Sequence, residues 1–233
     1  MALNHFTFNG QSTADFGLLV TGSKIFGAPS RKVEKFNVAG RNGDILVDQG
    51  VYENYIAQYD LAVVKNFKVN ARDIVNWLLS SSGYQRLEDT YDTDCYRMAS
   101  CYTSIEYITT ALNREGTCTV EFDCKPQRFL LTGETSQTFN SSGTITNPSQ
   151  MASKPLIRVT GTGSFTIGTY EVTVNTVDGY VDIDCETQQC YKGTTNCNND
   201  VVVDEFPQIE AGANTVTLDG VTSVEVWPRW WVL

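Results

Sequence analysis

Apolar and polar residues alternate through much of the first 130 positions, a period of two that is typical of half-buried β-strands. Near the start, Phe6 and Phe8 share one face of such a segment. A longer segment covers residues 55–64, where one face carries Tyr55, Ala57, Tyr59, Leu61 and Val63. Further alternating segments cover residues 96–108 and 117–123, and Pro126 is expected to stop the last one because proline cannot donate to a strand ladder.

One segment has a helical period instead. Ile74, Trp77, Leu78 and Ser81 recur at i, i+3, i+4 and i+7, which predicts a helix over about residues 71–81 with Asn70 as its N-cap. A shorter helical turn is expected after Ser12, where the run to Asp15 matches a capping box, and Gly17 should end it. The first half of the chain is therefore expected to be strand-rich with one packed helix.

Residues 31–55 predict a long hairpin arm. Phe36 and Val38 point one way while Lys35 and Asn37 point the other, and after residue 44 a second run alternates in the same manner. Between the two runs stands Asn42-Gly43, a pair that favours a two-residue type I′ turn. The alternation by itself leaves open whether this arm packs on its own domain or reaches another molecule.

A change in composition marks a domain boundary. Residues 133–154 are rich in Thr, Ser, Gly and Asn without strong apolar periodicity, which is typical of a linker. Short strands separated by glycine turns follow, at 156–160, 164–168, 170–175, 180–185, 216–218 and 224–233. We therefore expect a first domain over residues 1–132 and an all-β sandwich over residues 133–233.

Charge and composition exclude some classes of protein. The formal net charge is -10, and such an acidic chain does not bind nucleic acid by neutralising phosphates. No apolar run reaches the roughly 20 residues needed to cross a bilayer. The first residues lack the basic and apolar regions of a signal peptide, so we expect the chain to be made and folded in the cytoplasm and to have no membrane association.

The chain has seven cysteines, and an odd number without a secretion signal favours reduced thiols. Cys95 and Cys101, like Cys118 and Cys124, are six positions apart, so each pair would share a strand face. Four such thiols could hold zinc, but the short C-x-x-C spacing is missing. We expect buried thiols, no metal and no cofactor, while pairing of Cys185, Cys190 and Cys197 outside the cell stays open.

Candidate catalytic groups are few. The acidic run Asp89–Asp94 lacks the glycine and final glutamate of an EF-hand loop, so a solvated loop is expected there. Asp182 and Asp184 share a strand face and could serve a glycosidase, but alternating acids on an outer face are usually solvated. His5 is expected at the surface. No nucleophile elbow, phosphate loop or zinc-protease motif occurs, which favours a protein that is not an enzyme.

Six blocks of the sequence, in order, resemble the distal tail protein (Dit) family of long-tailed, siphovirus-type bacteriophages. They are FNGQSTADFGLLV, GRNGDILVDQGVYEN, CKPQRFL, VDIDCETQQCYKG, NNDVVVDEFPQIEAGANTVTLDG and PRWW. Together they span nearly the whole chain. The resemblance implies a mainly β protein with one helix in the first domain. The first domain would be a tail-tube-like β-sandwich or belt domain, and the second a galectin-like β-sandwich.

The resemblance further implies a structural virion protein of the tail tip, assembled in the host cytoplasm. It would be a homo-hexameric ring, single or stacked in pairs, that joins the tail tube to the baseplate. Its expected partners are the tail tube protein, a tail-tip protein of the tail-associated lysin or hub type, and receptor-binding or other baseplate proteins. DNA would pass through the central channel without sequence-specific binding.

Two sets of site residues follow from this interpretation. The hairpin arm is expected to carry subunit contacts through Arg41, Asn42, Gly43, Asp44 and Tyr52. An alternative function is a carbohydrate-binding module for host cell-wall glycan, with Trp227, Trp230 and Trp231 as a platform. The histidine of sugar-binding galectins is missing from the second domain, because His5 is the only histidine in the chain.

Overall fold

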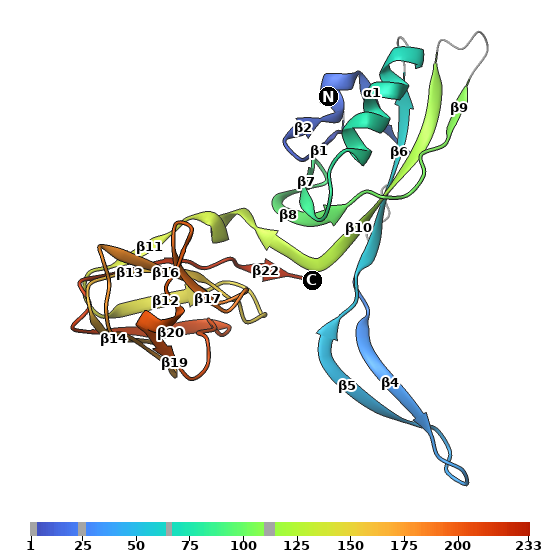
Figure 1. The fold of residues 1–233 in the computed structure, drawn as a ribbon. Coiled ribbons are helices and arrows are strands. Elements are labelled where there is room, and N and C mark those ends of the chain that lie inside the picture. Colours follow the sequence, from blue (N-terminus) through green and yellow to red (C-terminus); the bar gives the residue numbers. More distant parts are fainter. Residues whose placement is uncertain (1–3, 23–26, 64–66, 110–114) are drawn as a thin grey trace. The chain divides into compact units, whose positions relative to one another are not determined.

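The computed structural model describes residues 4–22, 27–63, 67–109 and 115–233. The chain forms two compact units, one of Met1–Arg128 with Leu233 and one of Phe129–Val232. Figure 1 shows strands in both units and one α-helix, α1, in the first. The described residues are thus mainly β with one α-helix, as the sequence predicted.

The first unit is built on one large antiparallel sheet. Its strands run in the order β2 (Gln11–Ser12), β1 (Phe6–Phe8), β7 (Gln85–Asp89), β8 (Asp92–Ser100), β10 (Gly116–Leu130), β6 (Tyr55–Val63) and β3 (Leu18–Thr21). Strand β9 (Tyr107–Thr109) also pairs with β10. A separate two-stranded sheet consists of β4 (Arg31–Asn37) and β5 (Asp44–Tyr52).

Alternation along β6 puts every second residue into the core, as predicted. Tyr59 and Leu61 are buried, and the partner strand β10 contributes Phe122, opposite Ala57. The rings of Phe6, Tyr59 and Phe122 lie within 6 Å of one another in tilted and edge-to-face arrangements. Such arrangements are the favourable ones for aromatic pairs, so these rings pack strand β1 against strands β6 and β10.

Helix α1 (Phe67–Leu79) packs against this core through Ile74, Trp77 and Leu78, the stripe that its spacing predicted. Its predicted limits were wrong, however. Asn70 lies inside the helix, where its side chain donates to the Phe16 carbonyl at 3.0 Å instead of capping. The short turn η1 (Thr13–Phe16) has the predicted capping box between Ser12 and Asp15, and Gly17 ends it with a φ of 64°.

Three other predictions about the first unit were wrong. The predicted strand over 96–108 is divided into β8 and β9 by residues 101–106. Pro126 does not end β10, because the ladder with β6 already stops at Cys124 opposite Tyr55 and needs no N–H from position 126 on that side. The expected solvated loop over Asp89–Asp94 is the tight turn between β7 and β8.

A buried ion pair stabilises that turn. The Asp89 side chain is fully buried and accepts from Tyr91 N, Asp92 N and the Arg97 guanidinium, while Tyr59 Oη donates to it at 2.5 Å. Burial, and then the nearby Asp89 charge, raise the pKa of Tyr59 above its ordinary value. Each partner satisfies the other, which is the condition for charged groups to be tolerated inside a protein.

The second unit is a β-sandwich of two sheets. One runs β11 (Gln137–Phe139), β21 (Ser223–Trp227), β13 (Leu156–Thr160), β16 (Tyr180–Asp184), β17 (Gln189–Lys192) and β18 (Thr195–Asn196). The other runs β12 (Gly143–Asn147), β20 (Gly212–Asp219), β14 (Gly163–Ile167), β15 (Tyr170–Val174) and β19 (Val201–Val203). The short strand β22 (Trp231–Val232) pairs with β10, whose last residues belong to this unit.

The core of the sandwich consists of the inward residues of both sheets, mainly Val and Ile. The stretch 133–154 is not a linker, since it holds the end of η3 (Leu131–Glu134) and the strands β11 and β12. Its apolar residues are few because these strands contribute little besides Phe139 and Ile145 to the core.

Asp182 and Asp184 share the outer face of β16, but they are not solvated as expected. Asp182 accepts two hydrogen bonds from the Arg158 guanidinium at 2.7 and 2.9 Å. Asp184 accepts from Arg229 at 2.7 and 3.3 Å and from the backbone N–H groups of Glu186 and Thr187. Bidentate pairing with arginine makes these carboxylates structural groups.

Candidate functional site

The β4–β5 ribbon is the one two-stranded sheet among the described residues, and hardly any of it is covered. Every residue of β4 is exposed, and so is every residue of β5 except the half-buried Tyr52. Both strands are edges, and an isolated two-stranded ribbon is at best marginally stable in water. A second surface that covered the ribbon would add to its stability.

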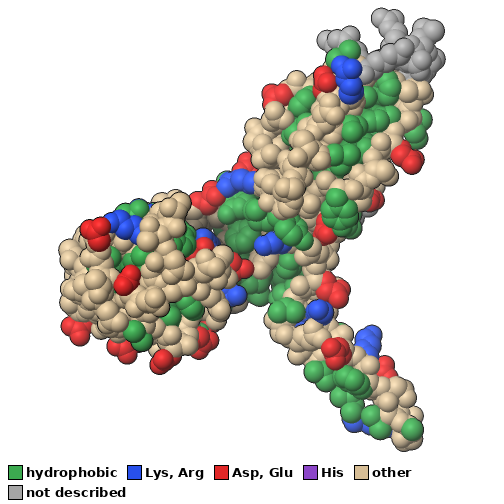
Figure 2. All heavy atoms as spheres, viewed as in Figure 1, with side chains coloured by type: hydrophobic (Ala, Val, Ile, Leu, Met, Phe, Trp, Pro, Cys, Tyr) green, Lys and Arg blue, Asp and Glu red, His purple; other side chains and the backbone are tan. Residues whose placement is uncertain are grey.

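One face of the ribbon is apolar. The register sets Phe36 opposite Ile45 and Glu34 opposite Val47, so these four side chains share a face. Phe36 is 49 %, Ile45 38 % and Val47 46 % exposed. We call these three residues the ribbon patch, and Figure 2 shows hydrophobic side chains gathered on this part of the molecule. Contiguous exposed apolar side chains are typical of interaction surfaces.

The opposite face is mixed. It carries Val33, Lys35 and Asp48 together with Leu46, which is 62 % exposed. The alternation that the sequence predicted for Phe36 and Lys35 is confirmed by this register. The ribbon thus has one mainly apolar side, which also carries Glu34, and one mixed side, and it is packed on neither.

The turn of the ribbon differs from the prediction. The last pair is Asn37 with Asp44, so the connection has six residues and is not a two-residue type I′ turn at Asn42-Gly43. A type I′ turn needs positive φ at both central residues, but here the positive values belong to Gly40 (81°) and Gly43 (80°). Arg41 N donates to Val38 O at 3.1 Å, which closes a first turn before Gly43 closes the second.

Polar contacts organise the other end of the ribbon. Arg31 pairs with Asp48 at 2.5 Å, and its guanidinium lies 5.3 Å from the centre of the Tyr52 ring. Gly50 N donates to Asp48 at 2.9 Å, and this bond, followed by Arg31, lowers the pKa of Asp48. All these groups are at the surface, where such pairs fix orientation more than they add stability.

The structure divides the predicted interface residues between two places. Arg41, Asn42 and Gly43 form the loop, with Asp44 as the first residue of β5, whereas Tyr52 lies at the other end of that strand. The ribbon patch lies between them and was not among the predicted site residues. Its signal was present in the sequence, where Phe36 lies in the first predicted strand of the hairpin and Ile45 and Val47 share a face of the second.

The uncovered face of the large sheet is acidic. Along β6 and β10 the residues that alternate with the core include Asp60, Glu121 and Asp123. Thr119 Oγ1 donates to Asp60 at 2.9 Å, and Asn54 and Tyr102 each donate to Asp123 at 2.9 Å. These hydrogen bonds stabilise the carboxylates without neutralising them.

A shallow, open hollow of about 570 Å³ lies on this same face. The carboxylates of Asp60, Glu106 and Glu121 line it, together with Thr117, Thr119 and other described residues, none of which is Lys or Arg. A surface of this kind repels polyanions and lets them pass without binding. We call Asp60, Glu106, Glu121 and Asp123 the acidic face.

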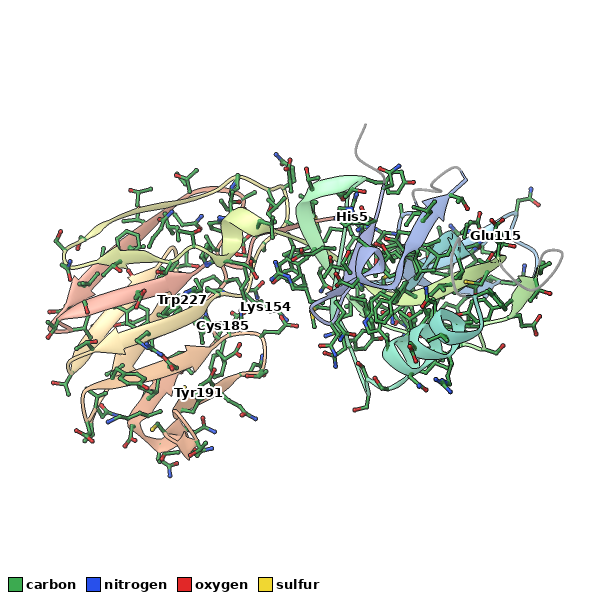
Figure 3. All side chains as sticks on the ribbon, turned by 90° about the horizontal axis from the view of Figure 1, so that it is seen from above. His5, Glu115, Lys154, Cys185, Tyr191 and Trp227 are labelled. Atoms are coloured by element: carbon green, nitrogen blue, oxygen red, sulfur yellow. The ribbon has the colours of Figure 1, made fainter. Side chains whose placement is uncertain are left out.

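The three tryptophans proposed as a glycan platform do not form one surface. Trp230 is 4 % exposed and belongs to the core of the sandwich. Trp231 is half-buried and donates from Nε1 to Ala152 O at 2.9 Å. Trp227, labelled in Figure 3, lies on the outer face of β21, with the Arg158 guanidinium 5.5 Å from its ring centre. Only Trp227 keeps part of its ring available on that face.

Other site types find little support in the part of the chain that the structure describes. No group of three or more His, Cys, Asp and Glu side chains is placed to hold a metal ion. The cysteines that alternate on the strands, Cys95, Cys101, Cys118 and Cys124, are all buried, as expected. Within the described ranges, no helix has both the length and the apolar character to span a membrane.

The fold closely matches solved phage structures. The Dit protein of phage SPP1, described as a paradigm of the hub adsorption apparatus in phages that infect Gram-positive bacteria, aligns over 100 % of both chains with a TM-score of 0.76 and 13 % identity. Chains of the phage P2 baseplate in its activated conformation align over 97 % of both chains, with a TM-score of 0.54 and 11 % identity in the calcium form and 0.52 and 10 % in the strontium form.

No protein-family model matches the sequence, and no curated protein matches it either. The likeness is therefore one of fold, and on that level the resemblance to distal tail proteins is confirmed. The chain has the two-unit, β-rich fold of a phage Dit protein.

Proposed function

We propose that the protein is a structural component of a phage virion, the distal tail hub. In this proposal it forms a hexameric ring that joins the tail tube to the tail tip and leaves a central channel for DNA. The full-length match to SPP1 Dit supports the hub assignment. The role is mechanical, and the chain is not an enzyme.

The observation that carries the ring is the uncovered ribbon patch. A ribbon with Phe36, Ile45 and Val47 exposed gains stability only when another surface covers these side chains. In the proposed ring that surface belongs to the next copy of the same chain. A closed ring of such contacts covers every ribbon and leaves none of the contacts unused. The loop residues Arg41–Asp44 and the Arg31–Tyr52 end would then orient the ribbon on the neighbour.

The acidic face supports the channel. If this face lines the ring, DNA meets carboxylates at Asp60, Glu121 and Asp123 and passes without being held. The tail tube, the tail-tip protein of the tail-associated lysin or hub type, and receptor-binding or other baseplate proteins are the proposed partners.

Assembly is tested first by light scattering on a gel-filtration peak, with negative-stain imaging of the same fraction. Six copies of the 25.9 kDa chain correspond to about 155 kDa, or twice that for two stacked rings. We expect closed rings with an open centre. A chain that stays monomeric up to about 100 μM would contradict the proposal.

A matched pair of variants tests the ribbon patch itself. Phe36→Glu with Val47→Glu should give folded monomers, because two charges on the patch oppose burial. Val202→Glu is the control, since Val202 is exposed to a similar degree (55 %) on a strand of the sandwich. It should leave the rings intact, and circular dichroism checks the fold of both. Rings that survive the ribbon variant would exclude the ribbon patch as the subunit contact.

The channel is tested by a cryo-electron microscopy map of the ring. We expect Asp60 and Glu121 to face the lumen. A map in which the acidic face points outward would refute the channel part of the proposal while leaving the ring standing.

A further inference from the structure

Three cysteines lie in one part of the sandwich, around the β17–β18 hairpin. Cys185 follows β16, Cys190 is in β17, and Cys197 follows β18. Cys185 and Cys190 are each 2 % exposed, whereas Cys197 is half-buried and packs against the same core. Figure 3 labels Cys185 and Tyr191 in this part of the sandwich.

Strand register sets Cys190 and Cys197 opposite each other. Lys192 pairs with Thr195 and Tyr191 with Asn196, so the next cross-strand pair is Cys190 with Cys197. Cys197 N donates to Cys190 O at 2.8 Å, which shows that the strands stay together at this position. Directly opposed residues in such a pair point to the same side of the sheet.

The spacing of such a pair suits a disulfide. Opposed Cα atoms of an antiparallel pair are about 4.5–5.5 Å apart. Here one of the two backbone bonds of such a pair is formed, and Cys190 N donates to Asn198 Oδ1 at 2.6 Å in place of the other. Disulfides join Cα atoms roughly 4.4–6.8 Å apart. Burial, and then the neighbouring Cys197, raise the pKa of Cys190 to about 11, and Cys190 also adds to the raised pKa of Cys185, so the choice of partner rests on the strand register.

Cys185 is a less suitable partner. The ladder between β16 and β17 pairs Asp184 with Gln189 and Ile183 with Cys190, so Cys185 is not opposite Cys190. Cys185 N also donates to Pro155 O at 3.1 Å, which ties this residue to the segment before β13.

We propose that Cys190 and Cys197 form an intrachain disulfide once the protein leaves the reducing interior of the cell. The extracellular setting rests on the proposed virion function. A small disulfide such as oxidised glutathione is the oxidant. The Cys197 thiolate attacks it and releases one thiolate, and the Cys190 thiolate then attacks the Cys197 sulfur and releases the second. Two protein thiols thus lose two protons and two electrons, and the oxidant becomes two thiols.

The cross-link acts at a weak point of the sandwich. Strand β18 has two residues and forms the edge of its sheet, and the short η4 turn (Asn198–Asp200) then leads to β19 in the other sheet. A covalent bond here restricts the unfolded chain and so stabilises the folded edge strand and the crossover to the other sheet.

Trypsin separates Cys190 from Cys197 but leaves Cys185 in the same peptide as Cys190, so the bond is assigned with the help of variants. Cleavage after Arg158, Lys192 and Arg229 puts Cys190 in the peptide 159–192 and Cys197 in the peptide 193–229. The full chain is treated with either dithiothreitol or oxidised glutathione, alkylated and analysed by mass spectrometry. The reduced chain should alkylate at all seven cysteines, and the oxidised chain at five, with the two peptides linked.

Variants assign the bond and its effect. Cys185→Ser should keep the linked peptides, and Cys197→Ser, at a half-exposed position that tolerates a hydroxyl, should abolish them. Oxidation should raise the Tm of the wild-type second unit by about 5 °C or more and leave that of Cys197→Ser unchanged.

Two results would overturn the proposal: seven alkylated cysteines in the oxidised sample, or loss of the link in Cys185→Ser. Light scattering on the same samples separates this question from the hub assignment. Rings without the cross-link would refute the disulfide alone, and cross-linked monomers would refute the ring alone.

Discussion

The β4–β5 ribbon and the β6–β10 strand pair have the same kind of sequence and opposite surroundings. Both pairs are antiparallel, and in each pair most of the side chains on one face are apolar. In β6 and β10 the apolar residues are buried, as Leu61 and Phe122 show at 0 % exposure. In the ribbon the equivalent residues, such as Phe36, stay exposed. Alternation therefore specifies a strand, but contacts with residues far away in the sequence decide whether its apolar side chains are buried.

The largest expected effect separates the two phenylalanines. Phe122→Ala should lower the free energy of unfolding by about 3–5 kcal/mol, because it leaves a cavity among packed aromatic rings. Phe36→Ala removes the same ring from the ribbon and should change that free energy by less than about 0.5 kcal/mol in a dilute, monomeric sample. Urea unfolding followed by tryptophan fluorescence measures both. Equal effects would show that the ribbon is packed within its own chain.

The buried Arg97–Asp89 ion pair and the exposed Arg31–Asp48 ion pair allow the same comparison between core and ribbon. Arg97→Met leaves the fully buried Asp89 without its cation and should cost about 3 kcal/mol of unfolding free energy. Arg31→Met removes the partner of Asp48 on the exposed ribbon and should cause no measurable change in the monomer. Adding Asp89→Asn to Arg97→Met should recover part of the loss. A stable Arg97→Met single variant would show that Asp89 does not depend on this arginine.

The pH dependence extends the comparison to the second unit. Burial alone would raise the pKa of Asp184, but the bonds from Arg229 and from backbone N–H groups more than offset it, so the pKa lies below its ordinary value. The contribution of the Asp184 carboxylate to the free energy of unfolding is therefore fully present above about pH 4. It is lost as the pH falls through the folded-state pKa. Asp184→Asn should lower the free energy of unfolding by about 1–3 kcal/mol at pH 7.

That variant should also flatten the acid limb of the stability curve. Thermal unfolding between pH 2 and 7 measures both effects. Asp48→Asn on the ribbon is the matched exposed carboxylate and should change the curve of the monomer much less, because the contacts that lower the pKa of Asp48 are at the surface and screened by solvent. An acid limb as steep in Asp184→Asn as in the wild type would assign the pH dependence to other groups.

The smallest effect concerns the ribbon turn. Gly40→Ala should lower the free energy of local opening of the ribbon by about 1 kcal/mol, because alanine is unfavourable at a φ of 81°. Asn42→Ala is the control, since Asn42 has no positive φ. Hydrogen exchange of the β4 and β5 amides should become faster in the first variant only, with global unfolding unchanged. Faster exchange in Asn42→Ala instead would support a type I′ turn.

Local patterns predicted much of the fold. The capping box at Ser12, the buried face of β6 and the four strands β13 to β16 follow from spacing alone, because each depends on residues close in sequence. The predicted first and last residues of the elements were less accurate. Asn70 has the chemistry of an N-cap, yet α1 begins before it because the carbonyl of Phe16, 54 positions away, offers its amide another partner.

The candidate site was only partly predictable. The hairpin was found from its alternation, and its loop residues Arg41–Asp44 follow from the glycines. The length of the turn did not follow, because the register of the ribbon begins at Asn37 with Asp44. The carboxylates Asp89, Asp182 and Asp184 resemble solvated acids in the sequence, and only their distant arginine partners make them structural.

The sequence by itself determined that this is a mainly β chain with one helix, and its ordered blocks pointed to the fold of distal tail proteins. Those features depend on periodicity and on short motifs, which are local properties of the chain. Only the tertiary structure decided which alternating strands are covered, because burial depends on residues far apart in sequence meeting in space. That is why Phe122 became part of the core and Phe36 stayed exposed.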